Sequence, residues 1–197
     1  MTVITPDFAQ RLRQALQRRA AATITDAQAQ RAAVAVIVTA EAEPAMLFVR
    51  RQERIGDPWS GHVAFPGGYA EPTDGSAAAT AVRETEEETG LVLSPSEALG
   101  TLDDVYPRSV HLPKVVVTPV AFCVSMRRPV APRAEIAATT WLPLAEVFSA
   151  GNRRPLELVL PSGRQAFESI VVGEFIIWGL TERILSQIAR LVVPPEA

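Results

Sequence analysis

The stretch GGYAEPTDGSAAATAVRETEEETGL, residues 67–91, decides the fold of this chain, because a glycine pair leads through a short loop into a run rich in Ala and Glu. The run contains neither Gly nor Pro between residues 76 and 89, which predicts a helix. Glu84, Glu87 and Glu88 follow the i, i+3, i+4 spacing and share one narrow face of that helix, since each residue advances by about 100°. Three carboxylates on one face suit a hard divalent cation such as Mg²⁺ or Mn²⁺, whose charge offsets their repulsion.

The ends and the other faces of this helix can also be predicted. Ser76 is placed to cap its start and Gly90 to stop it. Glu86 points away from the acidic face and is expected to be solvated. The neighbouring face carries small residues that we expect to be buried, namely Ala78, Ala81, Val82 and Thr85. An exposed acidic helix without a ligand is the alternative interpretation, because runs of charge are commonly solvated.

Composition narrows the class of protein. A chain of 197 residues with 48% hydrophobic and 21% charged residues predicts one globular domain with a real core. No apolar run approaches the roughly 18 residues of a membrane span, and the first residues do not resemble a secretory signal. Cys123 is the only cysteine, which excludes an intramolecular disulfide and favours a cytoplasmic setting. A net charge of -3 gives no general attraction to nucleic acid or to anionic membranes, whereas small anionic ligands remain compatible.

Short apolar runs on both sides of the acidic helix predict strands. The expected strands cover residues 32–39, 45–51, 98–106 and 114–125. Pro119 lies within the last run and suggests that this strand is at a sheet edge or contains a bulge. A strand ending near Trp141 should be followed by a short helix that begins at Pro143.

Helices are expected at both ends of the chain. Residues 1–30 form a helical extension, with Thr5 as its cap and Pro6 at its first position. Residues 173–192 have the periodicity of one long amphipathic helix, with Trp178 on its apolar face. Strands flanking a central helix indicate an α/β fold.

The acidic helix and the loop before it resemble the Nudix hydrolases, whose box reads G-x5-E-x7-R-E-U-x-E-E-x-G-U, with U an aliphatic residue. The residues in register with the second half of this box are Arg83, Glu84, Glu87, Glu88, Gly90 and Leu91. The first half differs, because Asp74 replaces the glutamate and eight residues, rather than seven, separate it from Arg83. Thr85 stands where the family has an aliphatic residue. Asp74 is therefore either a member of the site or a turn and capping residue before the helix.

The expanded spacing, together with VAFPGG, resembles the coenzyme A pyrophosphatase branch of that superfamily. Gly61, the segment LDDVY after the box and IIWGLTERIL near the end of the chain agree with it. One position departs from the branch, since Asp57 stands where an Arg is usual, four residues before the loop glycine.

The resemblance implies an α/β/α sandwich with a mixed central sheet, in which one catalytic helix follows a Gly-rich loop and extra helices lie at both ends. It further implies a single Nudix hydrolase domain over residues 1–197, with the extension at 1–30 and the box at 67–91. Glu84, Glu87 and Glu88 would hold Mg²⁺ or Mn²⁺, with the backbone carbonyl of Gly67 as a further ligand. Arg83 would orient one glutamate, and Arg83, Glu84 and Glu87 would count as catalytic.

Candidates for the remaining roles come from the neighbouring segments. Glu135, ahead of the segment Trp-Leu-Pro-Leu, is a candidate general base, with an exposed loop charge as the alternative. One of Arg50 and Arg51 is expected to reach phosphate and the other to face solvent, because side chains alternate along a strand. Trp59 is a candidate for stacking on adenine or, alternatively, a packing anchor, and Gly68 is a candidate substrate contact. We place no role on the two histidines, His62 and His111.

Three functions follow in order of preference. The first is divalent-metal-dependent hydrolysis of the diphosphate of coenzyme A or an acyl derivative, giving phosphopantetheine and adenosine 3′,5′-bisphosphate. The second keeps the chemistry and changes the substrate to a nucleoside triphosphate, a dinucleotide or a nucleotide sugar, which Asp57 favours. The third is a catalytically silent Nudix fold that binds a ligand. The partner expected in each case is a small diphosphate compound, without nucleic acid or membrane, and a homodimer is compatible with the sequence.

Overall fold

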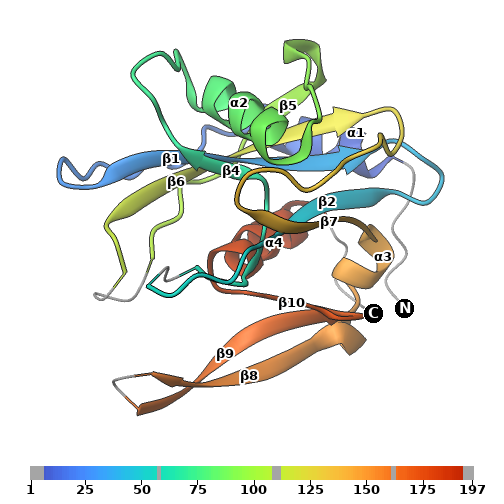
Figure 1. The fold of residues 1–197 in the computed structure, drawn as a ribbon. Coiled ribbons are helices and arrows are strands. Elements are labelled where there is room, and N and C mark those ends of the chain that lie inside the picture. Colours follow the sequence, from blue (N-terminus) through green and yellow to red (C-terminus); the bar gives the residue numbers. More distant parts are fainter. Residues whose placement is uncertain (1–6, 57–58, 108–111, 161–162, 193–197) are drawn as a thin grey trace.

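The fold is a mixed β-sheet covered by helices on both faces (Figure 1). The computed structural model describes residues 7–56, 59–107, 112–160 and 163–192. The predictions for Thr5, Pro6, Asp57 and His111 lie outside the described residues. Within the described part of the chain, no helix is long and apolar enough to cross a membrane.

The described residues form four α-helices and ten strands. The helices are α1 (Phe8–Gln17), α2 (Ala77–Thr89), α3 (Leu144–Val147) and α4 (Gly179–Val192). The strands of the central sheet are β1 (Gln30–Thr39), β2 (Ala45–Arg51), β3 (Val63–Ala64), β4 (Gly67–Tyr69), β5 (Ala98–Thr101), β6 (Val115–Val124) and β7 (Ile136–Pro143). A second sheet contains β8 (Arg153–Leu160), β9 (Gly163–Val172) and β10 (Phe175–Trp178). The expected mixed sheet, the helix after the Gly-rich loop and the presence of a helix near each end are thus confirmed, although α1 ends at Gln17 and the rest of the extension up to residue 29 is not helical.

The segment 63–69 is inserted between β1 and β2. These two strands pair at Val38 and Met46, near their connecting turn. Beyond this pair, β1 and β2 separate. The edge of β2 that faced β1 pairs with β3, and the edge of β1 that faced β2 pairs with β4. The glycine pair at the start of β4 is therefore built into the sheet directly beneath α2.

Gly67 can be replaced by no other residue without displacing the sheet. Its φ is +154°, and a Cβ on it would lie 2.3 Å from the carbonyl oxygen of Ala33 on the neighbouring strand. A Cβ on Gly68 would lie 2.6 Å from the carboxyl carbon of Glu84 on α2. Backbone and carboxylate can approach this closely only where the strand has no side chains.

Two apolar clusters hold the layers together, one on each face of the central sheet. On the α2 face, alternate residues of β1 pack near Ala81 and are fully buried, for example Ala35 and Ile37. On the opposite face, α1 and α4 pack on the sheet and contribute, among others, Phe8, Leu12, Ile184 and Leu185. Alternation along the strands therefore decides which side chains reach α2 and which reach α4.

The C-terminal region differs from the sequence prediction. Residues 175–178 form β10 and α4 begins only at Gly179, so the prediction of one helix over 173–192 is wrong at its start. Trp178 consequently ends a strand rather than lying on the apolar face of a helix. The hairpin of β8 and β9 was not predicted, and it extends away from the body of the molecule (Figure 1). Its apolar pattern is interrupted by the charged residues Arg153, Arg154, Glu157, Arg164 and Glu168, although Pro161, Ser162 and Gly163 are a turn signal in the sequence.

Pro119 lies in an interior strand, which contradicts the edge alternative. β6 pairs in parallel with β1 along its whole length and with β5 on its other side. The carbonyl of Pro119 accepts a hydrogen bond from the N–H of Leu102, just after β5 ends at Thr101. The proline nitrogen points to this same side, just beyond the end of β5, so the missing N–H falls outside the regular β5–β6 ladder.

The segment LDDVY, residues 102–106, connects residues 19–24 to the sheet by hydrogen bonds. The Asp104 carboxylate is 2% exposed and accepts hydrogen bonds from the N–H of Ile24 at 2.9 Å and from the hydroxyl of Thr118 at 2.6 Å. Asp103 accepts a hydrogen bond from the N–H of Ala22 at 2.7 Å and pairs with Arg19. These two aspartates therefore act in packing and contribute no group to the acidic face of α2.

The close approach at β4 can be tested with two glycine substitutions. We expect Gly67→Ala to lower the free energy of unfolding by about 3 kcal/mol, because it combines a strained φ with overlap against the Ala33 carbonyl. The matched control is Gly75→Ala, where a Cβ would meet nothing within 4 Å. Urea unfolding followed by circular dichroism measures both variants, and equal stability of the two would contradict this account of β4.

Candidate active site

Helix α2 begins and ends where its sequence signals predict. The Ser76 hydroxyl oxygen accepts a hydrogen bond from the N–H of Ala79 at 3.1 Å, and Gly90 closes the helix with a φ of +73°. Thr85, which replaces the aliphatic residue of the family pattern, is fully buried. Its hydroxyl donates a hydrogen bond of 2.6 Å to the carbonyl of Ala81, one turn earlier, so a polar residue is tolerated in the core.

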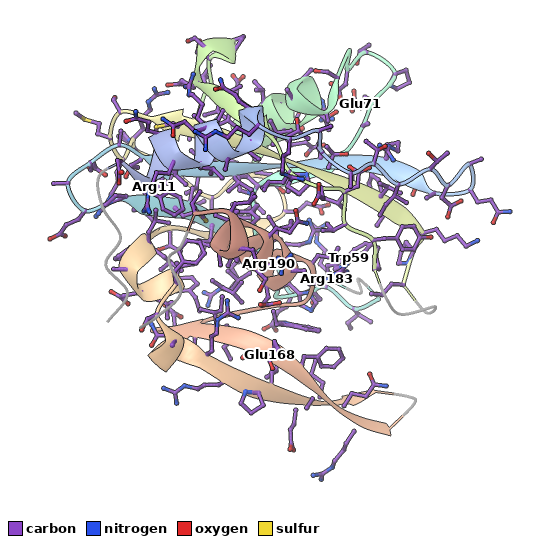
Figure 2. All side chains as sticks on the ribbon, turned by 180° about the vertical axis from the view of Figure 1, so that it is seen from behind. Arg11, Trp59, Glu71, Glu168, Arg183 and Arg190 are labelled. Carbon is purple, nitrogen blue, oxygen red and sulfur yellow. The ribbon has the colours of Figure 1, made fainter. Side chains whose placement is uncertain are left out.

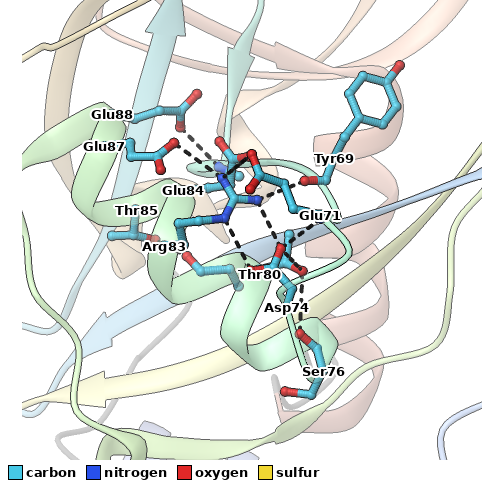
Figure 3. Close-up of polar contacts among 12 residues, drawn as sticks. Tyr69, Glu71, Asp74, Ser76, Thr80, Arg83, Glu84, Thr85, Glu87 and Glu88 are labelled. Carbon is cyan, nitrogen blue, oxygen red and sulfur yellow. Dashed lines mark hydrogen bonds and ion pairs between the residues drawn. The ribbon is translucent and has the colours of Figure 1, made fainter.

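Arg83 connects the acidic face of α2 with the preceding loop (Figure 3). Its Nη1 donates to Glu84 at 2.9 Å and to Glu87 at 3.2 Å. Its Nη2 donates to the backbone carbonyl of Tyr69 at 2.9 Å and to Asp74 at 3.0 Å. Hydrogen bonding to Asp74, followed by Glu84, raises the pKa of Arg83 above its ordinary value. One guanidinium thus orients two glutamates that the sequence analysis placed in the site.

Asp74 is both a loop residue and a member of this network. Its two oxygens bind the guanidinium of Arg83 at 3.2 and 3.0 Å. One oxygen also accepts hydrogen bonds from the N–H of Glu71 and from the hydroxyl of Thr80, each at 2.9 Å. The bond from Arg83, followed by that from Glu71, holds the pKa of Asp74 well below its usual range. The two interpretations of Asp74 are therefore compatible, since the extra residue in the spacing leaves the shorter aspartate within reach of Arg83.

Glu88 is the most buried carboxylate of the cluster, with 7% of the residue exposed. Its Oε2 accepts a hydrogen bond of 3.0 Å from the N–H of Gly67 in β4. Burial raises the pKa of Glu88 to about 7, against the opposing effect of the Gly67 hydrogen bond. The nearby charges of Glu84 and Glu135 add to the increase, and that of Arg51 reduces it. Because burial makes the ionised form of Glu88 costly, a cation bound beside it would stabilise that form.

Glu84 lies over Gly68, and Glu87 lies at the rim of the cluster. Burial is the largest cause that raises the pKa of Glu84, while Arg83 opposes it. The Glu87 side chain is 54% exposed. Glu84 and Glu87 turn toward Arg83 and Glu88 turns toward Gly67, so among the described residues no three acidic, histidine or cysteine side chains enclose a metal position.

Arg50 and Arg51 lie on opposite faces of the sheet. Arg51 is on the α2 side and its Nη2 lies 3.1 Å from Glu135. Arg50 pairs with Glu174 at 3.1 Å and its guanidinium carbon lies 5.8 Å from the centre of the Phe175 ring. The structure therefore brings Arg51 and Glu135 to the acidic helix and leaves Arg50 beside the second sheet.

A bulge in β7 accompanies this arrangement. The pairing of β7 with β2 shifts between Arg50 and Arg51, where Ile136 rather than Ala137 faces Arg51. Bulges re-aim side chains at the ends of strands. Ala134, just before this bulge, is the one non-glycine with a positive φ in the described part of the chain, at +51°.

Trp59 and the histidine of the loop lie away from the carboxylates. Trp59, labelled in Figure 2, is partly buried and packs against the core cluster on the α4 side. The ring of His62 lies 4.5 Å from that of Trp178, which in turn lies 5.4 Å from that of Phe167. The structure thus places Trp59 in a packing position.

Sequence reasoning overlooked two parts of the site. Arg54 received no individual role there, although it pairs with Glu135 in the structure. The contribution of Thr80 was missed as well, although its place one turn after Ser76 could have suggested a contact with the preceding loop.

The comparisons with known proteins agree with this geometry. The family model described as NUDIX domain matches residues 29–160. The uncharacterized Nudix hydrolase NudL of Escherichia coli (strain K12 / DH10B) is 30% identical over 159 residues, which cover 80% of this chain and 80% of NudL. NudL of Yersinia pestis (strain Pestoides F) is 33% identical over 164 residues, which cover 82% and 79% of the two chains. The crystal structure of a MutT/nudix family protein from Enterococcus faecalis has the same fold, with a TM-score of 0.62 at 16% identity, over 94% of this chain and 71% of that one.

The fold and the site together define a hydrolase of phosphoric anhydride bonds. The chain belongs to the Nudix family, and it is a Nudix pyrophosphohydrolase of nucleoside-diphosphate-linked substrates. Members of this family generally use divalent metal ions. The resemblance on which the sequence analysis relied is confirmed at the level of the superfamily and of the enzyme class.

The burial of Glu88 predicts a pH dependence of stability. Its pKa is about 7 in the folded protein against 4.5 in the unfolded chain, so the folded state binds more protons between these values. Stability of the metal-free protein should therefore fall by up to about 3 kcal/mol as the pH rises from 5 to 8. Chemical unfolding in EDTA at several pH values measures this slope.

The variant Glu88→Gln keeps an oxygen to accept from Gly67 and should remove most of the slope, leaving the smaller part that belongs to Glu84. Glu86→Gln is the control on the exposed face of the same helix and should retain the wild-type slope. Parallel curves for all three proteins would show that Glu88 is not the group responsible.

Proposed function

We propose that this Nudix hydrolase cleaves the diphosphate of coenzyme A or of an acyl-coenzyme A, releasing phosphopantetheine and adenosine 3′,5′-bisphosphate. The observation that carries the reaction is the cluster of Glu84, Glu87 and Glu88, oriented by Arg83 and by the backbone of β4. The choice of coenzyme A rests on sequence resemblance, chiefly on the expanded spacing from Gly68 through Asp74 to Arg83.

The residues present fit Mg²⁺ or Mn²⁺ in their donor chemistry. Hard divalent cations prefer carboxylate and carbonyl oxygens, and the acidic face of α2 presents three carboxylates. Glu84 and Glu88 lie against β4 at a point where any side chain on Gly68 would occupy the space beside the carboxylates. The N–H of Gly67 points to Glu88 and not to β1, so its carbonyl lies on the same side and is available as a further ligand.

Arg83, Arg51 and Glu135 would have different roles in hydrolysis. When bound, the metal neutralises the diphosphate and lowers the pKa of a water molecule. Arg83 keeps Glu84 and Glu87 at the site, and Arg51 binds a phosphate oxygen from the end of β2. Glu135 accepts the proton of the attacking water, as a general base supplied from outside the acidic helix.

A second candidate substrate has one feature in its favour. Asp57 replaces the arginine that is usual in the coenzyme A branch, which favours a nucleoside triphosphate, a dinucleotide or a nucleotide sugar. A silent ligand-binding module is the third candidate, and the three glutamates with their intact Arg83 network speak against it. We propose a small-molecule substrate in the cytoplasm in each case, with the enzyme acting as a monomer or a homodimer and without nucleic acid or membrane.

A panel of substrates tests the proposed specificity. Purified protein with Mg²⁺ or Mn²⁺ is incubated with coenzyme A, dephospho-coenzyme A, NADH, ADP-ribose and nucleoside triphosphates, and products are separated by chromatography. We expect the highest kcat/KM for the first two compounds, with phosphopantetheine as the common product. A preference for any other compound would support the second candidate substrate class. If no compound of the panel were hydrolysed, only the third candidate, the ligand-binding module, would remain.

The assignment of the metal ligands is tested by matched glutamine variants of α2. Glu88→Gln should lower kcat about 100-fold or more, because a metal ligand stabilises the transition state by several kcal/mol. Glu86→Gln should change it less than twofold, since this side chain is exposed on another face. Added Mg²⁺ should raise the thermal midpoint of the wild type and of Glu86→Gln but not of Glu88→Gln. Equal activity of the two variants would reject Glu88 as a ligand.

A further inference from the structure

Three charged side chains outside the acidic helix form a compact group at the end of β2. Glu135 binds Arg51 through one carboxylate oxygen, at 3.1 Å, and Arg54 through the other. The three side chains remain accessible, at 24% exposed for Arg51, 47% for Arg54 and 49% for Glu135. The ion pairs within the described residues thus join two guanidinium groups to one carboxylate, and all three side chains are open to solvent.

The backbone around this group is fastened to the active site. The N–H of Gln52 donates to the carbonyl of Glu135 at 2.8 Å, which joins the end of β2 to the loop before β7. The N–H of Arg133 donates to the carbonyl of Glu88 at 2.9 Å, which joins the same loop to α2. The N–H of Arg54 donates to the hydroxyl of Ser60 at 2.8 Å. The loop that carries Glu135 is thus hydrogen-bonded both to the end of β2 and to the backbone of Glu88, which places the group beside the deepest carboxylate of the cluster.

We propose that Arg51 and Arg54 are a binding site for the phosphate oxygens of the substrate, and that Glu135 occupies this site until the substrate displaces it. The proposal rests on the function proposed above and adds Arg54 as a substrate-binding residue. Guanidinium groups bind phosphate oxygens in the same forked geometry with which they bind a carboxylate.

The exchange is favourable for two reasons. A partly exposed arginine–carboxylate pair contributes no more than about 1 kcal/mol, so little is lost when it breaks. A diphosphate carries more negative charge and more acceptor oxygens than one carboxylate, so it binds two arginines more strongly than Glu135 does. The displaced Glu135 is then repelled by the phosphates and free of its two partners, which makes its oxygens available to a water molecule.

This arrangement predicts effects of opposite sign for the members of one ion-pair group. Removing the charge of Arg51 or Arg54 weakens phosphate binding, whereas removing the charge of Glu135 strengthens it, because the competitor is lost. A group that only stabilises the loop would not produce this difference in sign.

Calorimetric titration of metal-stripped protein with inorganic pyrophosphate in EDTA tests the proposal without turnover. We expect Arg51→Gln and Arg54→Gln to weaken binding about 10-fold each, and Glu135→Gln to tighten it about threefold or more. The matched control pair is Arg127 and Glu41, which bind each other at 3.2 Å with similar exposure beside the turn at the opposite end of β2. Arg127→Gln and Glu41→Gln should bind pyrophosphate as the wild type does, and urea unfolding checks that each variant is folded.

The proposal is wrong if Glu135→Gln binds pyrophosphate no more tightly than the wild type does, or if Arg54→Gln binds pyrophosphate as tightly as the wild type does. An enzyme that is active on the substrate panel but shows either result keeps its proposed function and loses this binding site. Opposite shifts in a chain that hydrolyses none of the panel would support the phosphate site and reject the proposed reaction.

Discussion

The close approach between helix α2 and strand β4 is the constraint on which the rest of the structure depends. Two glycines allow the strand backbone to lie against the carboxylates of Glu84 and Glu88, with the N–H of Gly67 as a hydrogen-bond donor. This contact requires β4 to lie between the separating edges of β1 and β2, and it requires small residues on the buried face of α2. The burial that raises the pKa of Glu88 follows from the same packing, so fold and electrostatics have one origin.

Charge balance explains why so many acidic side chains are tolerated together. Arg83 binds Glu84, Glu87 and Asp74, and Asp74 is in turn fixed by Thr80 and the loop backbone. A single cation within the helix therefore stabilises carboxylates that would otherwise repel one another. The same network connects the loop before α2 to the residues that the proposed mechanism places on the metal.

The two faces of the central sheet carry different groups of residues, and the adjacent Arg50 and Arg51 fall on opposite faces. Arg51 and Glu135 lie on the α2 side with the carboxylates. Arg50, Trp59 and the rings that contact Trp178 lie on the side of α4 and the second sheet. The two sides differ in chemistry, since the first gathers charge around a buried glutamate and the second gathers aromatic packing. The resulting asymmetry places Arg51, and not Arg50, on the side of the carboxylates.

The sequence by itself determined the features that depend on local chemistry. The caps at Ser76 and Gly90, the shared face of the three glutamates and the strand 45–51 follow from propensity, periodicity and short-range hydrogen bonds. Only the tertiary structure decided the features that depend on distant partners. Residues 175–178 form a strand because β9 offers a partner edge, and Pro119 is tolerated inside the sheet because β5 ends beside it. Asp74 belongs to the Arg83 network because Arg83 reaches back to the loop. In each case the deciding hydrogen bond joins residues that local sequence patterns do not relate.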